Sequence, residues 1–394
     1  MLLQQNSMEK NENSILSIMV KLTPPMGWNS WNTFGENISE QLIMETADAM
    51  VDEGLLEKGY EYLVIDDCWS LRERDENGRL VADPEKFPHG MKAVADYVHS
   101  KGLKFGMYSC AGNLTCAGYP GSFEHEFVDA ETFAEWGVDF LKYDYCYHSP
   151  IIPGKYLYRR MGLALENCGR DILFSACSWG ADETHEWIKE TGASMWRSTG
   201  DIFDTWESIK DLTKQQEKLH PFNGVGCFND MDMLVVGMYG KGNVGLAGCT
   251  DVQYKTHYSI WALLGSPLMI GCDIRNMNQA TKDILMNPEM IAINQDPLCR
   301  QPVRLTGIWS GEDVVLYSRQ LSNGDLAIGL FNMSDKKTTV NLNLDELGLP
   351  LSTKRTLHLK EVWTGEERNV PNATLRKELE PFDCAVYRGK VVKL

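Results

Sequence analysis

The chain has 394 residues, of which 43% are hydrophobic and 24% are charged, a composition that suits one large globular domain and one small one. Its formal net charge is −17 and it contains no run of basic residues, which argues against nucleic acid and anionic membranes as partners. The eleven cysteines form no Cys-x-x-Cys pair and no cluster with zinc spacing, so the sequence predicts no structural metal.

The first segment of the chain, residues 1–20, is expected to be a loose polar tail. It lacks the basic segment and the continuous apolar stretch that mark a secretion signal or a membrane span. The odd number of cysteines, mostly within apolar runs, is typical of buried thiols in a reducing compartment. We therefore expect a cytoplasmic protein.

After the tail, the chain repeats a pattern in which a helix ends at a glycine and an apolar strand follows. Ser39 can cap the first helix and Asp129 a later one. Glycine readily takes the left-handed conformation that ends a helix, and it precedes a strand five times, at Gly59, Gly102, Gly137, Gly169 and Gly192. Such repeats are typical of βα units and a parallel sheet.

Eight strands are expected before about residue 300, beginning near residues 26, 62, 103, 139, 171, 194, 225 and 268. This number predicts a (β/α)8 barrel over residues 21–303, with a doubly wound open sheet as the alternative. Polar residues follow nearly every strand. A barrel gathers such residues on one face, whereas an open sheet would spread them along an edge, so the barrel is favoured.

Beyond Pro302 the pattern changes to short strands of alternating polarity, separated by turn residues. They are expected at residues 313–317, 326–331, 338–342 and 385–387. We predict an antiparallel β-sandwich over residues 304–394. It contains no cluster of acids or histidines, so its expected role is to cover the flank of the barrel.

The residues that follow the predicted strands are typical of a sugar-binding site. Aromatic rings stack on the apolar face of a pyranose, and charged side chains bind its hydroxyls. No histidine pair or metal ligand set is present, so neither a metal nor a cofactor is expected. The residues are Trp28, Trp31, Asp66, Asp67, Tyr108, Lys142, Asp144, Cys177, Trp179, Arg197, Asp201, Asp230 and Asp232.

Hydrolysis of a glycoside needs one ionised and one protonated carboxyl group. Asp144 is the predicted nucleophile, because Lys142 lies two residues away on the same face of the strand and would keep it ionised. Asp201 is the predicted general acid/base, since partial burial after the turn at residues 198–200 would raise its pKa. Asp66 and Asp67 are expected to bind sugar hydroxyls, and Asp230 and Asp232 to have a structural role.

Five motifs, in the same order along the chain, resemble glycoside hydrolase family 27, which comprises α-galactosidases and α-N-acetylgalactosaminidases. The resemblance extends from about Leu22 to Asp296 and continues more weakly into the C-terminal domain. The motifs are Met26-Gly-Trp-Asn-Ser-Trp31, Ile65-Asp-Asp-Cys-Trp69, Lys142-Tyr-Asp144, Trp196-Arg-x-x-x-Asp-Ile202 and Asn229-Asp-x-Asp-Met233.

This resemblance implies a retaining enzyme that uses no metal and has a barrel followed by a β-sandwich. It assigns Asp144 as the nucleophile and Asp201 as the acid/base. It also implies that eight residues bind the sugar: Trp31, Asp66, Asp67, Tyr108, Lys142, Cys177, Trp179 and Arg197.

The cysteines differ in part from those of the secreted animal members. The loop at residues 33–37 lacks the cysteine that pairs there with the Ile-Asp-Asp-Cys motif, so Cys68 is expected to be a thiol. Cys116 and Cys146 match a bridged pair of those relatives. Whether they are bridged here stays open, because a cytoplasm is reducing.

A second difference concerns the substrate. Many α-galactosidases have Cys-Glu-Trp after the fifth strand, whereas this chain has Cys177-Ser178-Trp179 with Ala181 close behind, as in the animal N-acetylgalactosaminidases. Ser178 and Ala181 are therefore expected to contact the substrate and to leave room for a 2-acetamido group. We predict a retaining exo-glycosidase that releases terminal α-linked D-galactose from oligosaccharides or glycoconjugates, with α-N-acetylgalactosamine a near-equal alternative.

Two other classes of protein are less consistent with the sequence. The G-x-G-x-x-G pattern at residues 240–245 is typical of dinucleotide binding only when a helix follows, and no amphipathic helix is expected there. A non-catalytic carbohydrate-binding barrel would have lost Asp144 or Asp201, and both are present. The aglycone, the preferred linkage and assembly into a homo-oligomer are left open.

Overall fold

A computed structural model of the chain describes residues 23–307 and 313–394. The tail expected at residues 1–20 lies outside the described residues. Within them, no helix combines the length and the apolar character that crossing a membrane requires.

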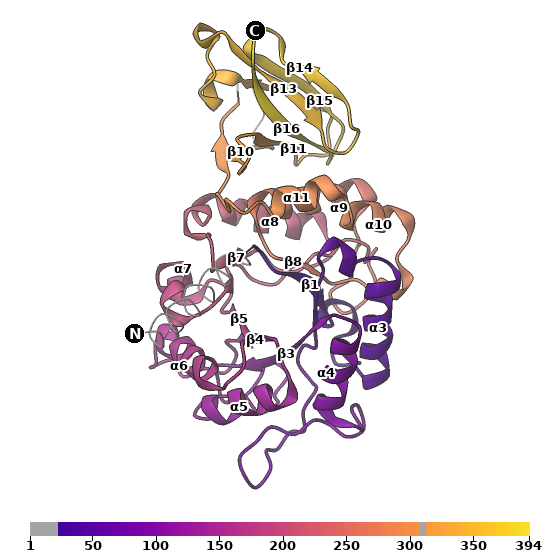
Figure 1. Cartoon of the computed structure of the whole chain (residues 1–394), viewed down its shortest axis with the longest axis vertical. Helices are drawn as coiled ribbons and strands as arrows, with labels where there is room; N and C mark the ends of the chain where they lie inside the picture. The colour runs from indigo at the N-terminus through magenta and orange to yellow at the C-terminus, as the bar shows by residue number, and fades with distance from the viewer. Residues whose placement is uncertain (1–22, 308–312) are drawn as a thin grey trace, which may run out of the picture.

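The larger domain is built on eight parallel strands in the order β7-β6-β5-β4-β3-β2-β1-β8, arranged as a ring in Figure 1. Leu234, four residues beyond β7, closes the ring by forming a parallel bridge with Ile270 of β8. The amide of Leu234 donates to the carbonyl of Met269 at 2.7 Å. The (β/α)8 barrel is thus confirmed. Its strands are β1 (Met26–Asn29), β2 (Tyr62–Val64), β3 (Lys104–Cys110), β4 (Phe140–Asp144), β5 (Leu173–Cys177), β6 (Met195–Arg197), β7 (Phe228–Asp230) and β8 (Leu268–Ile270).

Helices surround this ring, as Figure 1 shows. The α-helices are α2 (Trp31–Phe34), α3 (Glu40–Asp52), α4 (Gly90–Ser100), α5 (Glu126–Trp136), α6 (Gly154–Asn167), α7 (Thr184–Trp187), α8 (Trp206–Gln215), α9 (Asp251–Leu264), α10 (Gln279–Leu285) and α11 (Pro288–Asn294). Short 3-10 helices occur at Leu56–Lys58, Ala181–Glu183, Ile188–Thr191, Gln216–Lys218, His220–Phe222, Ile274–Asn276, Leu344–Leu347, Leu351–Thr353 and Pro371–Ala373.

The expected helix boundaries are mostly confirmed. The Ser39 hydroxyl accepts a hydrogen bond from the Leu42 amide at the start of α3. The five glycines expected to end helices all have positive φ, between 80° at Gly102 and 98° at Gly59. The cap expected at Asp129 is wrong, because α5 begins at Glu126 and the Asp129 carboxylate is buried inside the helix against Arg74.

The seventh strand also begins later than expected. Residues 224–227 form a turn, in which Gly226 has φ 80° and the Val225 side chain is exposed. The strand β7 starts only at Phe228. An apolar side chain can thus mark a turn, and hydrophobicity alone does not separate it from the strand that follows.

Alternate residues of the strands point into the barrel. Phe140 and Lys142 of β4, Met195 and Arg197 of β6, and Met269 of β8 line one small enclosed space. In β4 and β6, the apolar residue of this set lies two positions before the charged one. The barrel therefore has an apolar filling towards the N-terminal ends of its strands and charged groups towards their C-terminal ends.

The smaller domain is the predicted antiparallel β-sandwich. Its larger sheet has the order β14-β13-β16-β11-β10-β9, and β12 pairs with β15 in a second sheet. The apolar faces enclose a core of their own that includes Leu316, Val340, Leu357 and Leu375. The strands are β9 (Val303–Leu305), β10 (Val314–Gln320), β11 (Leu326–Asn332), β12 (Thr338–Asn343), β13 (Arg355–Glu361), β14 (Glu367–Asn369), β15 (Thr374–Leu379) and β16 (Cys384–Lys393).

The sandwich lies against the barrel helices α8, α9 and α11 (Figure 1). The buried Arg319 donates to the carbonyl of Leu263, and the Thr256 hydroxyl donates to the carbonyl of Phe382. The predicted division after residue 303 falls inside β9, which pairs with β10.

Substitution of Arg74 is expected to destabilise the barrel strongly. Arg74 binds Asp129 with both guanidinium nitrogens, at 2.6 and 2.8 Å, and the Asp129 side chain is fully buried. Arg74→Met leaves this carboxylate without its counter-ion and should lower the free energy of unfolding by about 3–5 kcal/mol, measured by urea denaturation.

Arg79→Met is the matched control. Arg79 pairs with Glu135 at the surface, where both side chains are exposed. An exposed pair is screened by water, so this variant should unfold close to the wild type. Equal losses in the two variants would show that burial of Asp129 is not the cause.

Candidate active site

A cavity of about 210 Å³ lies at the C-terminal ends of the barrel strands. It is smaller than the roughly 300–1,000 Å³ of pockets for drug-sized ligands, which suits one small molecule. Twelve residues were predicted to act in catalysis or to bind the sugar. Nine of them line this cavity: Trp31, Asp66, Asp67, Tyr108, Lys142, Asp144, Trp179, Arg197 and Asp201. Trp31 and Asp201, which are 170 residues apart in the sequence, thus line the same cavity, as expected of a barrel.

Asp144 is the last residue of β4, and its carboxylate is held from two sides. Oδ1 accepts a hydrogen bond from the Tyr145 amide at 2.9 Å, and Oδ2 accepts one from the Tyr108 hydroxyl at 3.0 Å. Burial raises the pKa of Asp144 to about 6, although the charge of Lys142 and both hydrogen bonds act in the opposite direction. The carboxylate is therefore fixed in place but easily protonated.

Lys142 pairs with Asp66 and not with Asp144. Its Nζ lies 2.7 Å from Oδ2 of Asp66, which also accepts a hydrogen bond from Asn29. The expectation that Lys142 would keep Asp144 ionised is only partly right, since its charge lowers the pKa of Asp144 by less than burial raises it. The reason is that Lys142 has a nearer carboxylate.

Asp66 and Asp67 both face the cavity because the chain bends directly after them. Cys68 has φ 71°, and Oδ1 of Asp67 accepts a hydrogen bond from its amide at 2.7 Å. Oδ2 of Asp67 accepts a second one from the Ala117 amide at 3.0 Å. Burial nevertheless raises the pKa of Asp67. Two adjacent carboxyl groups thereby reach one site.

Arg197, at the end of β6, is shared by two carboxylates. Its Nη2 lies 2.9 Å from Oδ1 of Asp201, and its Nη1 lies 3.0 Å from Oδ1 of Asp232. Burial raises the pKa of Asp201, but the charge and the hydrogen bond of Arg197 outweigh it, and the pKa lies below its ordinary value. The expectation of a raised pKa is therefore wrong in direction, and the Asp201 side chain is 62% exposed.

Asp232 lines the cavity, although the sequence assigned it only a structural role. Besides Arg197, it holds the chain next to Asp201, because Oδ2 accepts a hydrogen bond from the Ile202 amide at 2.7 Å. Asp232 itself has φ 78°, and Oδ1 of Asp230 accepts a hydrogen bond from its amide. The Asn229-Asp-x-Asp-Met233 motif includes Asp232 and could have marked it as a site residue. The positive φ of Asp232 and its two partners, Arg197 and the Ile202 amide, could not be predicted from the sequence.

Three predicted substrate contacts, Cys177, Ser178 and Ala181, are not among the residues that line the cavity. The Cys177 thiol is buried and accepts a hydrogen bond from Arg197. Ser178 is also fully buried, with its hydroxyl 2.6 Å from that of Thr184, whose hydroxyl in turn donates to the carbonyl of Ala181. This local network turns the Ser178 hydroxyl into the protein and not towards the cavity, whereas the expected contact of Ala181 with the substrate stays a prediction.

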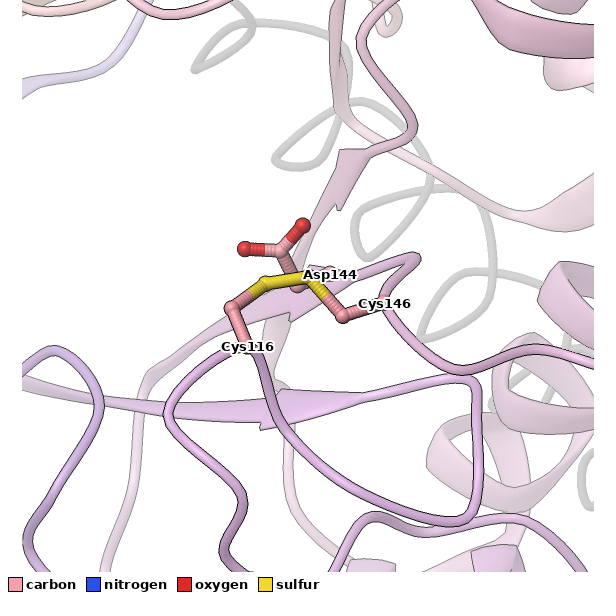
Figure 2. A group of neighbouring side chains, drawn as sticks. All are labelled: Cys116, Asp144 and Cys146. Atoms are coloured by element: carbon pink, nitrogen blue, oxygen red, sulfur yellow. A yellow bond between two sulfur atoms is a disulfide. The ribbon is translucent and has the colours of Figure 1, made fainter.

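Cys116 and Cys146 form a disulfide, and both line the cavity. Figure 2 shows the two sulfur atoms directly beside the Asp144 carboxylate. The bridge joins the loop that follows β3 to the chain just beyond β4. Cys68 is a buried thiol, as expected.

Comparison with known proteins agrees with this arrangement. The sequence model of the family described as "Alpha galactosidase A" matches residues 23–296, and that of the "Alpha galactosidase C-terminal beta sandwich domain" matches residues 305–388. The chain belongs to glycoside hydrolase family 27. The resemblance seen in the sequence is thereby confirmed.

Relatives of known name cover most of the chain. An α-galactosidase of Cyamopsis tetragonoloba is 43% identical over 366 residues, which is 93% of this chain and 85% of that protein. α-Galactosidase A of Cellvibrio japonicus is 46% identical over 325 residues, covering 79% of this chain and 76% of the relative.

Among solved structures, α-galactosidase I of Mortierella vinacea superposes with a TM-score of 0.87 at 34% identity, over 93% of this chain and 96% of that one. The Saccharomyces cerevisiae α-galactosidase with raffinose gives 0.85 at 33% identity, over 94% and 98%. A family 27 β-L-arabinopyranosidase from Geobacillus stearothermophilus gives 0.82 at 26% identity, over 95% and 97%. The fold alone therefore does not fix the sugar.

Proposed function

We propose that this protein is a retaining exo-α-galactosidase that releases terminal α-linked D-galactose from oligosaccharides or glycoconjugates. The observation that carries the proposal is one cavity in which Asp144 and Asp201 meet the aromatic and charged side chains expected of a single-sugar site. Galactose is favoured because the relatives at 42–46% identity are named α-galactosidases, and the yeast structure contains raffinose, an α-galactoside.

The proposed reaction has two steps. Asp144 attacks the anomeric carbon while Asp201 gives a proton to the departing oxygen, which leaves a galactosyl ester on Asp144. Asp201, now ionised, then takes a proton from a water molecule that attacks the same carbon and frees Asp144. Two inversions give net retention of the α configuration. The distance between the two carboxyl groups is expected to be about 5–5.5 Å, as in other retaining enzymes.

The other polar side chains of the cavity are assigned to the sugar hydroxyls. Lys142 and Asp66 form a pair that can donate and accept hydrogen bonds together, and Asp67 offers the same acceptor on the adjacent residue. The indole rings of Trp31 and Trp179 offer apolar surface for the pyranose ring. These groups would hold the sugar with its anomeric carbon towards Asp144.

The pKa values of Asp144 and Asp201 are in the opposite order to the one that the first step requires. Asp144 has a pKa of about 6, whereas the pKa of Asp201 is lowered by Arg197. A single proton therefore resides mainly on Asp144, although the reaction needs it on Asp201. We infer that a bound sugar shifts the proton, since it shields the exposed Asp201 from water and its hydroxyls compete for Arg197.

The preference for galactose is tested with aryl α-galactoside and aryl α-N-acetylgalactosaminide side by side. The galactoside should have the larger kcat/KM, and NMR should show α-galactose as the first product. Asp144→Asn should lower the rate at least about 10³-fold with an unchanged circular dichroism spectrum, because an amide cannot act as the nucleophile. A β first product, or near-normal turnover of Asp144→Asn, would exclude the mechanism. Faster hydrolysis of the acetamido substrate would assign the other sugar.

The role of Asp201 is tested by the dependence of the rate on the leaving group. Asp201→Asn should lower kcat/KM for methyl α-galactoside by about 10²–10⁴-fold, because its leaving oxygen needs a proton. For 2,4-dinitrophenyl α-galactoside, which leaves without a proton, the loss should be less than about tenfold. Equal losses for both substrates would mean that Asp201 positions the sugar and does not transfer the proton.

The pH dependence of kcat/KM follows from the two carboxyl groups of the free enzyme. The reactive form carries one proton on the pair, so kcat/KM should fall as pH rises above about 6, where Asp144 loses its proton, and again at acidic pH, where Asp201, with its lowered pKa, gains one. Tyr108→Phe removes a hydrogen bond that lowers the pKa of Asp144, so its upper limb should move to higher pH.

Tyr147→Phe, at an exposed tyrosine three residues beyond Asp144, is the control and should leave this limb in place. If the high-pH limb of the kcat/KM profile is unchanged in Tyr108→Phe, a group other than Asp144 titrates there.

A further inference from the structure

The disulfide and the proposed nucleophile form a group of potential metal ligands. Within residues 23–307 and 313–394, Cys116, Asp144 and Cys146 are the one set of three such residues whose donor atoms all lie within 4.8 Å of one another. Figure 2 shows the Asp144 carboxylate next to the two bonded sulfur atoms. In the oxidised protein each sulfur is bonded to the other, so the set has no thiolate to offer.

Reduction would turn this group into a site with three ligands. A dithiol reductant supplies two electrons and two protons, which break the S–S bond, give two thiols and leave the reductant as its own disulfide. Two thiolates on zinc lie about 2.3 Å from the metal, hence roughly 3.8 Å from each other in a tetrahedral site. The Cα atoms of Cys116 and Cys146 are 5.1 Å apart, so a small rotation of the side chains is sufficient.

The position of this group favours a cation. Cys116 is exposed and Cys146 is half-buried, so a reductant and an ion can reach both from the cavity. Five carboxyl groups line the cavity against two cationic side chains: Asp66, Asp67, Asp144, Asp201 and Asp232 against Lys142 and Arg197. The two cations are themselves paired with Asp66 and with Asp201 and Asp232, which leaves Asp67 and Asp144 without a cationic partner.

We propose that the reduced protein binds one thiophilic divalent ion, such as zinc, through Cys116, Cys146 and Asp144, and that this ion blocks the nucleophile. Binding releases the two thiol protons to solvent and leaves the fourth tetrahedral position to water. The disulfide form cannot bind the ion in this way and stays active. The pair is thus a redox-controlled inhibitory site and not a cofactor site, and its effect on turnover rests on the proposed function.

The test uses Co²⁺ as a spectroscopic probe and Zn²⁺ as the inhibitor, on the full chain. The protein is reduced with dithiothreitol and desalted without oxygen, because dithiothreitol itself binds metals. Reduced protein should bind one Co²⁺ with a near-ultraviolet thiolate-to-cobalt absorption band, whereas the disulfide form should show none. Zn²⁺ on the order of 10 µM should lower kcat/KM of the reduced protein at least about tenfold, reversibly with EDTA.

Two variants control the assignment. Cys116→Ser/Cys146→Ser should lose the cobalt band, and Zn²⁺ should not change its rate from its own metal-free value. Cys168→Ser, at a partly exposed thiol that caps the C-terminal end of α6, should keep both responses of the wild type. A single Cys116→Ser variant serves the same purpose should the double variant fail to fold.

Zinc inhibition of equal strength in the disulfide and reduced forms, or in the double serine variant, would overturn the proposal, as would loss of the folded state on reduction. The cobalt band does not depend on turnover. Failure of the proposed function would instead appear as an inactive disulfide form with normal cobalt binding after reduction.

Discussion

The site depends on how a few buried charges are paired at the ends of β4 and β6. Lys142 and Arg197 are enclosed in the barrel, where an unpaired cation would cost several kcal/mol. Lys142 is neutralised by Asp66, and Arg197 by Asp232 together with Asp201. Asp144, like Asp67, consequently has no cation directly beside it. Burial then raises the pKa of Asp144 to about 6, against the charge of Lys142.

Much of this could be read from the sequence, for a physical reason. Gly59 and Gly137 precede strands because only glycine ends a helix cheaply with positive φ, so each glycine marks a boundary that tertiary contacts cannot easily move. Barrel topology then places the strand ends together, whatever the helices between them do. Local rules that are enforced by backbone geometry therefore predicted the barrel and nine of the residues that line its cavity.

The expectations that failed depended on where one side chain turns. Ser178 was assigned to the sugar from its resemblance to the N-acetylgalactosaminidases, but Thr184 offers its hydroxyl a partner inside the protein. Asp129 fits a helix cap by type, yet Arg74, 55 residues earlier, draws it into the core. Lys142 is near Asp144 in sequence and nearer to Asp66 in space. In each case a second partner competes with the expected one, and the sequence contains no measure of that competition.

The loop after β3 connects the two sides of the cavity in a way that does not depend on the disulfide alone. Its Ala117 amide donates to Asp67, and the Tyr108 hydroxyl, which donates to Asp144, also lies 3.5 Å from the Cys116 sulfur. Asp67 is therefore tied to this loop by a hydrogen bond, and Asp144 is held by Tyr108 of β3, beside the covalent bridge. These two hydrogen bonds involve neither sulfur atom of the bridge, so we expect that opening the bridge frees two sulfur ligands while the carboxylate beside them keeps its place. A site that can lose its covalent link and keep its geometry is the kind that an ion can enter.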